Sequence, residues 1–398
     1  MHSAATMLTS HSLLLPLLSG SVHAANLWAT HYSGTINYLS FSGGALSVSS
    51  SAKTGNNLPS WITYDNAAPA LYIPDEVFYG PSTGSLVSFA VGANGSVTAT
   101  GKGTTPQGVV ASTLYGGSDG KGFIANAHYQ SSTVTTFKLP LTGGSPLETF
   151  KYTMSSRGPN SRQDAPHPHH VFVDPTGQYL LATDLGADLI RINKIDKTTG
   201  KLTECPSVKP APGTGPRHGV FWSPAGNTSR VRRQTANTFL FVANELANTV
   251  SSWAVSYPSG GCMSMTLKHT ITPYSGNATA TRGTKIGEIK TKGNFLYTSN
   301  RNDKKFSPND SMTQYTIAKD GSFAWTETTS SYGTYPRTFD INKAGDFVAI
   351  GDQTSSNVAI VARDTKTGKL GQRVADLRIG ATGIPENEDG LSAVVWAE

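Results

Sequence analysis

Short runs of alternating apolar and polar residues, each followed by a polar turn, recur along almost the whole chain. A period of two residues is typical of β-strands, and the pattern contains no convincing amphipathic helix. One run of apolar residues that ends in a polar pair appears seven times, at intervals of roughly 50 residues. The copies begin at Leu27, Tyr72, Ile124, Leu181, Val242, Tyr297 and Ala349. This repeat predicts an all-β fold: a seven-bladed β-propeller with four antiparallel strands in each blade.

A second pattern precedes several of these copies and sets the direction of the strands. Residues 170–177, 219–226 and 338–345 each form an apolar strand that ends in a turn containing glycine. Each blade therefore starts with a strand, a turn and a returning strand. Residues just before the first strand and just after the second then share one face, near the central channel. The C-terminal run 390–396 predicts a strand that pairs with the N-terminal strands and closes the ring, which removes exposed sheet edges.

Composition narrows the class of protein. Charged residues make up only 15%, and the 41 glycines and 22 prolines fit many strand connections rather than disorder. The net charge is +6, but the basic residues are scattered, so we expect no nucleic-acid partner. No apolar stretch is long enough to span a bilayer, so we expect no membrane partner either. We expect a monomer whose partner is a uronate-containing glycan or another anionic small molecule.

The N-terminus and several short motifs point to secretion. The apolar run 13–18 is followed by small residues up to Ala24, which predicts a signal peptide over 1–24 and one propeller domain over 25–398. Glycosylation sequons begin at Asn94, Asn227, Asn277 and Asn309. Cys205 and Cys262 fall on neighbouring predicted blades, where they either pair as one disulfide or remain two buried thiols. We therefore expect an extracellular protein.

Chemistry-bearing residues concentrate at the two strand ends that share a face. Six of the ten histidines lie there: His31, His128, His167, His169, His170 and His218. The same positions hold carboxylates and arginines, namely Glu76, Asp184, Glu245, Asp352, Arg217, Arg301 and Arg337. Histidine transfers protons near neutral pH, and arginine offers a two-pronged fork to a carboxylate. The set predicts chemistry on an anion, and the alternative is a solvated rim of ordinary polar strand ends.

Metal and cofactor chemistry finds little support in the motifs. His167 and His169 alternate on one extended segment, but the sequence shows no complete set of metal ligands. Nucleotide fingerprints, phosphate loops and nucleophile elbows are absent. We expect no cofactor and no metal site, with a divalent cation in the central channel as the alternative.

Several segments resemble a known family. Residues 167–177 and 182–188, together with Gly215-Pro216-Arg217-His218 and 242–246, resemble the seven-bladed lactonase family. That family includes 6-phosphogluconolactonase-type proteins and the carboxymuconate lactonizing enzyme. The resemblance implies that His169, Arg217, Glu245 and Arg301 are catalytic. An insertion around 227–234 departs from the family pattern.

The predicted secretion also suggests a likeness to the lyase that releases terminal L-rhamnose from α-1,4-linked D-glucuronate, with His128 as a further catalytic residue. β-Elimination needs a base for the uronate C5 proton and a cation that neutralises the carboxylate. The first expectation is therefore an enzyme, a secreted carbon–oxygen lyase. The alternatives are a lactonase or lactonizing enzyme and a non-catalytic glycan-binding propeller. The expected substrate-binding residues are His31, Glu76, His167, His218, Asp184, Arg337 and Asp352.

Overall fold

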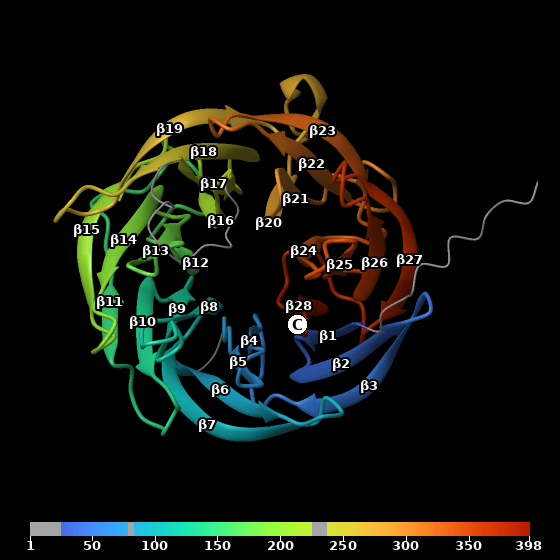
Figure 1. The fold of residues 1–398 in the computed structure, drawn as a ribbon, viewed down its shortest axis with the longest axis horizontal. Helices are drawn as coiled ribbons and strands as arrows, with labels where there is room; N and C mark the ends of the chain where they lie inside the picture. Colours follow the sequence, from blue (N-terminus) through green and yellow to red (C-terminus); the bar gives the residue numbers. More distant parts are fainter. Residues whose placement is uncertain (1–24, 79–82, 225–236) are drawn as a thin grey trace, which may run out of the picture.

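Seven four-stranded antiparallel sheets surround a central channel, as the repeat predicts (Figure 1). The computed structural model describes residues 25–78, 83–224 and 237–398. Within them the only helical element is a 3-10 turn at Ser275–Asn277. From the channel outward, the sheets are β28 (Leu391–Trp396), β1 (Ala25–His31), β2 (Thr35–Ser42), β3 (Ala45–Lys53); β4 (Thr63–Asp65), β5 (Ala70–Pro74), β6 (Thr83–Val91), β7 (Val97–Pro106); β8 (Val109–Tyr115), β9 (Phe123–His128), β10 (Thr133–Lys138), β11 (Glu148–Lys151); β12 (Pro168–Val173), β13 (Tyr179–Asp184), β14 (Leu189–Ile195), β15 (Leu202–Val208); β16 (Pro216–Trp222), β17 (Thr238–Asn244), β18 (Thr249–Ser256), β19 (Ser264–Ile271); β20 (Lys285–Lys292), β21 (Phe295–Arg301), β22 (Ser311–Ile317), β23 (Phe323–Ser330); and β24 (Pro336–Ile341), β25 (Phe347–Asp352), β26 (Asn357–Arg363), β27 (Leu370–Arg378).

The two ends of the described chain close the ring. The C-terminal strand β28 is the innermost strand of the sheet that also holds β1, β2 and β3 (Figure 1). It pairs with β1 in an antiparallel register that sets Leu27 opposite Trp396 and Ala29 opposite Val394. The predicted closure is confirmed, and residues from both ends of the chain hold one blade together.

The apolar alternation fills the space between neighbouring blades. Along β13, Leu180 and Ala182 pack toward the sheet of β8 to β11. Leu181, between them, packs toward the sheet of β16 to β19. Successive side chains of a strand point to opposite faces, so one apolar strand serves two cores. This sandwiching explains why every residue of β13 is buried.

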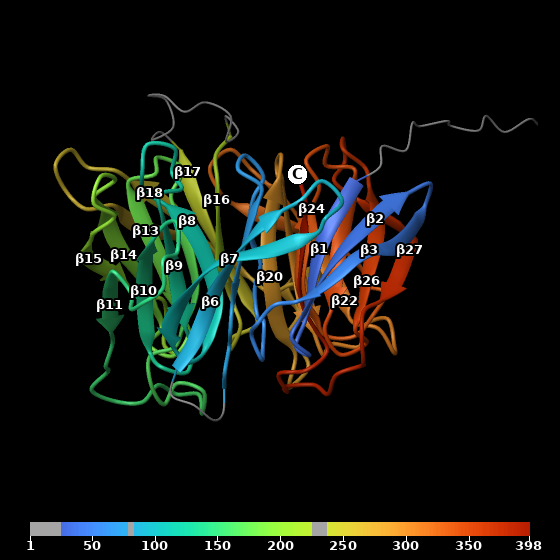
Figure 2. The same cartoon turned by 90° about the horizontal axis from the view of Figure 1, so that it is seen from below.

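The strands run between two broad faces of the ring (Figure 2). The first strand of each blade, for example β12, starts at one face and ends in a tight turn at the other. In the turn after β12, the Asp174 carboxylate accepts hydrogen bonds from the backbone N–H groups of Thr176, Gln178 and Tyr179 at 2.7 to 3.0 Å. Gly177 has a φ of 65°, which glycine adopts without strain. The Asp-Pro-x-Gly sequence thus forms the predicted turn.

Cys205 and Cys262 form a disulfide with a Cα–Cα distance of 5.8 Å, which confirms one of the two expectations for them. The bond joins the blade that ends in β15 to the blade that ends in β19. The sequon asparagines Asn94 and Asn277 are exposed, and Asn309 is half-buried. Asn227 and the predicted signal peptide lie outside the described residues. None of the helical structure in the described ranges is long and apolar enough to cross a membrane.

Candidate active site

A cavity of about 150 Å³ lies at the face where the first strands begin and the second strands end. The chain directions explain its polarity, because polar residues before the first strands and after the second strands converge there. Its charged residues and tyrosines are Glu76, Glu245, Glu386, Glu388, Arg162, Arg301, Arg337, His169, Tyr32, Tyr129 and Tyr335. The cavity occupies the place that the alternation of strands and turns predicts.

A β-bulge at the start of the inner strands positions the key side chains. The strand pairing shifts register between Pro168 and His170, and likewise around the residues that follow Pro216 and Pro336. The extra residues at these shifts are His169, Arg217 and Arg337. A bulged residue leaves the regular alternation and can be aimed at a site beside the sheet. Proline at each of these places removes a backbone donor that a regular ladder would use.

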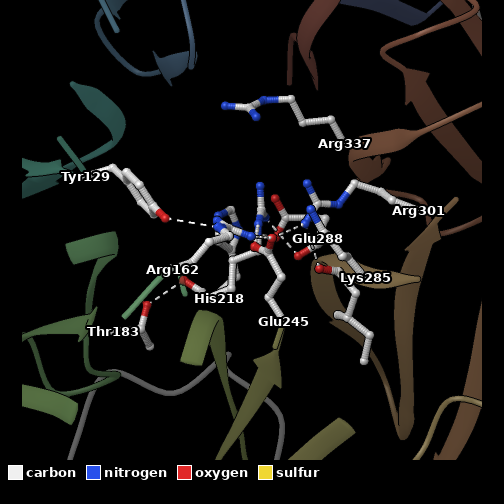
Figure 3. Close-up of polar contacts among 12 residues, drawn as sticks. Tyr129, Arg162, Thr183, His218, Glu245, Lys285, Glu288, Arg301 and Arg337 are labelled. Atoms are coloured by element: carbon white, nitrogen blue, oxygen red, sulfur yellow. Dashed lines mark hydrogen bonds and ion pairs between the residues drawn. The ribbon is translucent and has the colours of Figure 1, made fainter. Parts of the chain in front are cut away.

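Glu245 is the centre of the charge network (Figure 3). It directly follows β17, and only 2% of its surface is exposed. Its carboxylate pairs with Arg162, with Arg217 (Nε–Oε2 3.0 Å) and with Arg301 (Nη2–Oε1 3.0 Å). Burial alone would raise the pKa of Glu245, but the charges of these arginines outweigh it and hold the pKa well below the usual range. Glu245 is therefore an anion that orients guanidinium groups, and it is a poor proton acceptor.

The arginines are further fixed by backbone carbonyls. Arg217 is 1% exposed and donates from Nη1 to the carbonyl oxygen of Gly287 at 2.8 Å. Burial, with the charge of Arg301, lowers the pKa of Arg217 to about 9, so its side chain still carries a charge at neutral pH. Arg301 donates from Nη2 to the carbonyl oxygen of Ile286 at 3.1 Å. Guanidinium groups held in this way present preorganised positive charge to the cavity.

His169 lines the cavity as a neutral imidazole. Burial, followed by the charge of Arg217, lowers the pKa of His169 well below 6.5. Its Nδ1 atom has no hydrogen-bond partner within the described residues. The rings of Tyr129 and His218 lie edge-on to it, with centroids 5.7 Å and 5.2 Å away. A neutral histidine that faces a polar cavity can accept a proton from a bound water molecule.

Each of the three arginines that line the cavity lies over a tyrosine ring. The distances from guanidinium carbon to ring centroid are 5.5 Å for Arg162 over Tyr129, 5.2 Å for Arg301 over Tyr335 and 5.6 Å for Arg337 over Tyr32. Such cation–π contacts hold a cation in place without neutralising it. The tyrosines thus fix three positive groups around the cavity.

Several predicted site residues meet here. His169, Glu245 and Arg301 line the cavity, and Arg217 pairs with Glu245 from outside the lining. Of the expected substrate-binding residues, Glu76 and Arg337 line the cavity as well.

The remaining predicted residues lie outside the cavity lining. His128 is fully buried and its Nε2 is 2.8 Å from the hydroxyl oxygen of Thr135. His31 hydrogen-bonds Ser33 and the carbonyl oxygen of Ala381. The other positions are also buried among protein groups: His167 against the carbonyl oxygen of Tyr129, His218 against Glu288, Asp184 against Arg191, and Asp352 with 0% of its surface exposed.

The sequence reasoning missed residues that the structure brings to the cavity. Arg162 and Glu388 lie in loops between blades, where no periodic pattern marks a position. Tyr129 follows His128 by one residue, and that single step decides which side chain reaches the cavity. The residues that the sequence did predict at the bulges have such a signal, because a His or Arg follows a proline there: His169, Arg217 and Arg337. Among described residues, no group of three or more His, Cys, Asp or Glu side chains is arranged to hold a metal ion.

The fold and cavity together define a seven-bladed β-propeller with a polar cavity that three arginines and four glutamates line. A family model described as "Lactonase, 7-bladed beta-propeller" matches residues 26–384, and the chain belongs to this family. A probable 6-phosphogluconolactonase of Arthroderma benhamiae is 31% identical over 324 residues, which cover 80% of this chain and 77% of the relative. The 6-phosphogluconolactonase of Bacillus subtilis is 27% identical over 250 residues, and the match spans 62% of this chain and 65% of that protein.

Solved structures agree on the fold. The periplasmic gluconolactonase PpgL of Pseudomonas aeruginosa superposes with a TM-score of 0.75 at 23% identity, covering 94% of this chain and 99% of that chain. A putative 6-phosphogluconolactonase from Bacteroides fragilis has a TM-score of 0.75 at 22% identity, with 96% and 99% covered. At these identities the likeness shows the shared architecture.

Proposed function

We propose that the protein is a lactonase that hydrolyses a sugar lactone bearing an anionic group, of the kind that 6-phosphogluconolactonases act on. One observation carries the proposal: a neutral, cavity-lining His169 lies among arginines that Glu245 orients through ion pairs. The names of the family and of the curated relatives support the same chemistry.

The reaction follows from these positions. His169 accepts a proton from a water molecule, and the oxygen of that water attacks the lactone carbonyl carbon. The carbonyl oxygen becomes an oxyanion, and an arginine such as Arg301 stabilises the developing charge. The ester bond to the ring oxygen then breaks, and that oxygen takes the proton from His169. One water is consumed, and the product is an open-chain hydroxy acid. A second arginine holds the anionic group of the substrate, because a guanidinium forms paired hydrogen bonds to phosphate or carboxylate.

The comparisons favour this reading over the rhamnosyl-glucuronate lyase that was the first expectation from the sequence. Three of the curated relatives are named 6-phosphogluconolactonase or probable 6-phosphogluconolactonase. The structure also gives His128, the residue tied to the lyase, no place in the cavity lining. We propose in addition that the protein acts outside the cell on a small anionic substrate. The observed disulfide supports this location, because such bonds persist in oxidising compartments.

A panel of substrates tests the proposal. Wild-type protein and His169→Gln are incubated with a phosphorylated sugar lactone, the same lactone without phosphate, and a rhamnose-capped glucuronate glycan. Acid release is titrated at constant pH with the spontaneous hydrolysis subtracted, and the glycan products are analysed by mass spectrometry. We expect fast hydrolysis of the phosphorylated lactone that His169→Gln lowers by about 100-fold or more. Release of rhamnose with an unsaturated uronate, and no lactone hydrolysis, would restore the lyase.

A further inference from the structure

The cavity is not uniformly basic, because one side of it is acidic. Glu76 follows β5, and Glu388 lies in the loop between β27 and β28; both line the cavity. Arg337 belongs to this side, and in Figure 3 it lies apart from the group around Glu245. The lining therefore sets three arginines against four glutamates, and only Arg217 and Lys285, which pair with Glu245 and Glu386 from outside the lining, add positive charge. A ligand with several carboxylates would find too little compensation here.

Glu76 is held in one orientation and keeps one oxygen available. Tyr32 donates to its Oε2 at 2.5 Å, and Arg337 Nη2 donates to the same oxygen at 3.4 Å. The other oxygen, Oε1, has no hydrogen bond to a described residue. The backbone of Glu76 is also fixed, because its N–H donates to the carbonyl oxygen of Leu58 at 2.8 Å. An ionised carboxylate only accepts hydrogen bonds, and the hydroxyl groups of a sugar supply the donors.

Glu388 is held over the cavity by a clamp on its loop. Gln353, which is 3% exposed, donates from Nε2 to the carbonyl oxygens of Asn387 at 2.8 Å and Asp389 at 3.1 Å. The residues on either side of Glu388 are thus fixed to the end of β25. Arg337 pairs with Glu76 rather than with Glu388, and its charge attracts the Glu388 carboxylate from nearby. Burial, together with the charge of Glu76, raises the pKa of Glu388.

We propose that Glu76 and Glu388 form an acidic wall that selects lactones with several hydroxyl groups and disfavours hydroxyl-free lactones that carry extra carboxylates. The proposal rests on the proposed function and deepens it. The arginines around Glu245 bind the anionic end of the substrate, and the acidic wall accepts hydrogen bonds from its hydroxyls. Carboxylates brought against this wall meet like charge, which raises the free energy of binding.

The test compares two substrates whose responses to one substitution differ in direction. Kinetic constants are measured for wild type and Glu388→Gln with a phosphorylated sugar lactone and with a hydroxyl-free lactone bearing a carboxymethyl group. Loss of a charged hydrogen-bond acceptor raises KM for the sugar lactone by about tenfold. Removal of the negative charge lowers KM for the carboxymethyl lactone. Glu204→Gln, at an exposed position on β15, makes the same charge change away from the cavity and leaves both values unaltered.

A second variant tests the contact by which Gln353, itself part of the cavity lining, holds the loop. Gln353→Ala releases the loop, so it raises KM for the sugar lactone as well, and combining it with Glu388→Gln adds little further effect. Binding of the open-chain phosphorylated sugar acid is measured in parallel by calorimetry. Unchanged KM and unchanged acid binding in Glu388→Gln overturn the acidic wall. If no lactone is turned over but Glu388→Gln weakens binding of the sugar acid, the wall stands and the proposed function falls.

Discussion

The two faces of the ring use buried carboxylates in opposite ways. On the turn face, Asp174 satisfies its oxygens with backbone N–H groups of its own turn and with the hydroxyl of Thr176. On the cavity face, Glu245 pairs with three arginines from three separate parts of the chain. Near it, His169 Nδ1 and Arg301 Nε have no hydrogen-bond partner among the described groups. The first arrangement completes the fold locally, and the second leaves polar atoms for a ligand.

The Asp174 turn serves stability, whereas the Glu245 cluster serves function. A self-contained turn contributes to folding wherever it occurs, since its partners are adjacent in sequence. The charge cluster depends on packing between neighbouring blades, because Glu245 and Arg217 belong to the β16–β19 blade while Arg301 ends β21 of the next blade and Arg162 precedes β12 of the one before. Buried polar atoms without partners are costly, and those of His169 and Arg301 belong to residues that line the cavity, where a substrate can supply the missing partners.

Glu245→Gln gives the largest expected effect. It leaves three buried or half-buried arginines without their shared counter-ion, so we expect a loss of about 3 kcal/mol in the free energy of unfolding. The arginines also lose their common orientation, and kcat/KM for the phosphorylated lactone falls by at least about 100-fold. Urea unfolding and titration of acid release measure the two effects. Near wild-type activity in a folded Glu245→Gln protein would contradict the role given to the cluster.

Asp174→Ala disrupts a hydrogen-bonded turn on the face opposite the cavity. It removes several hydrogen bonds at a turn, so we expect a loss of about 2 kcal/mol in the free energy of unfolding with kcat/KM unchanged. Asp174→Asn is the matched control, because it keeps one acceptor oxygen and should lose less. A large drop in kcat/KM for Asp174→Ala, measured at a temperature where the protein stays folded, would show that the two faces are coupled.

The third expected effect is the response of stability to acid. Burial lowers the pKa of His128 from 6.5 to about 4, and burial also lowers the pKa values of His169, His170 and His218. Below pH 6.5 the unfolded chain binds protons at these sites while the folded chain does not. Stability is therefore full above pH 6.5 and declines as the pH falls toward 4, by up to about 1.4 kcal/mol per pH unit for one histidine.

Urea midpoints measured from pH 7.5 to 4.5 test this slope. His128→Gln keeps a polar group near Thr135 and should flatten the slope without changing kcat/KM, because His128 lies outside the cavity lining. A slope identical to that of the wild type would mean that His128 is not neutral in the folded protein.

The fold could be predicted from the sequence because each blade repeats one local pattern. Strand pairs, the turn at Asp174 and the closing strand β28 all depend on neighbours in the sequence or on alternation. His169, Arg217 and Glu245 could be placed for the same reason, since they stand at fixed points of the repeat. Arg162 and Glu388 could not, because they lie in loops between blades and reach the cavity only through contacts that form in the folded ring.

A second residue placement that the sequence could not predict is that Tyr129, rather than the preceding His128, lines the cavity. β9 ends at His128, and it is the next residue, Tyr129, that lines the cavity; the sequence does not reveal where a strand ends relative to the channel. Bulges add to the difficulty, because one extra residue turns His169 and Arg217 out of the regular order.

The central claim is that this cavity hydrolyses lactones that carry a negative charge, with His169 as the base. The most direct measurement is kcat/KM for one sugar lactone with and without its phosphate group, in wild type and in His169→Gln. We expect kcat/KM to be at least about tenfold higher for the phosphorylated lactone, and both values to collapse in His169→Gln. Equal rates on the two lactones, or full activity in His169→Gln, would contradict it.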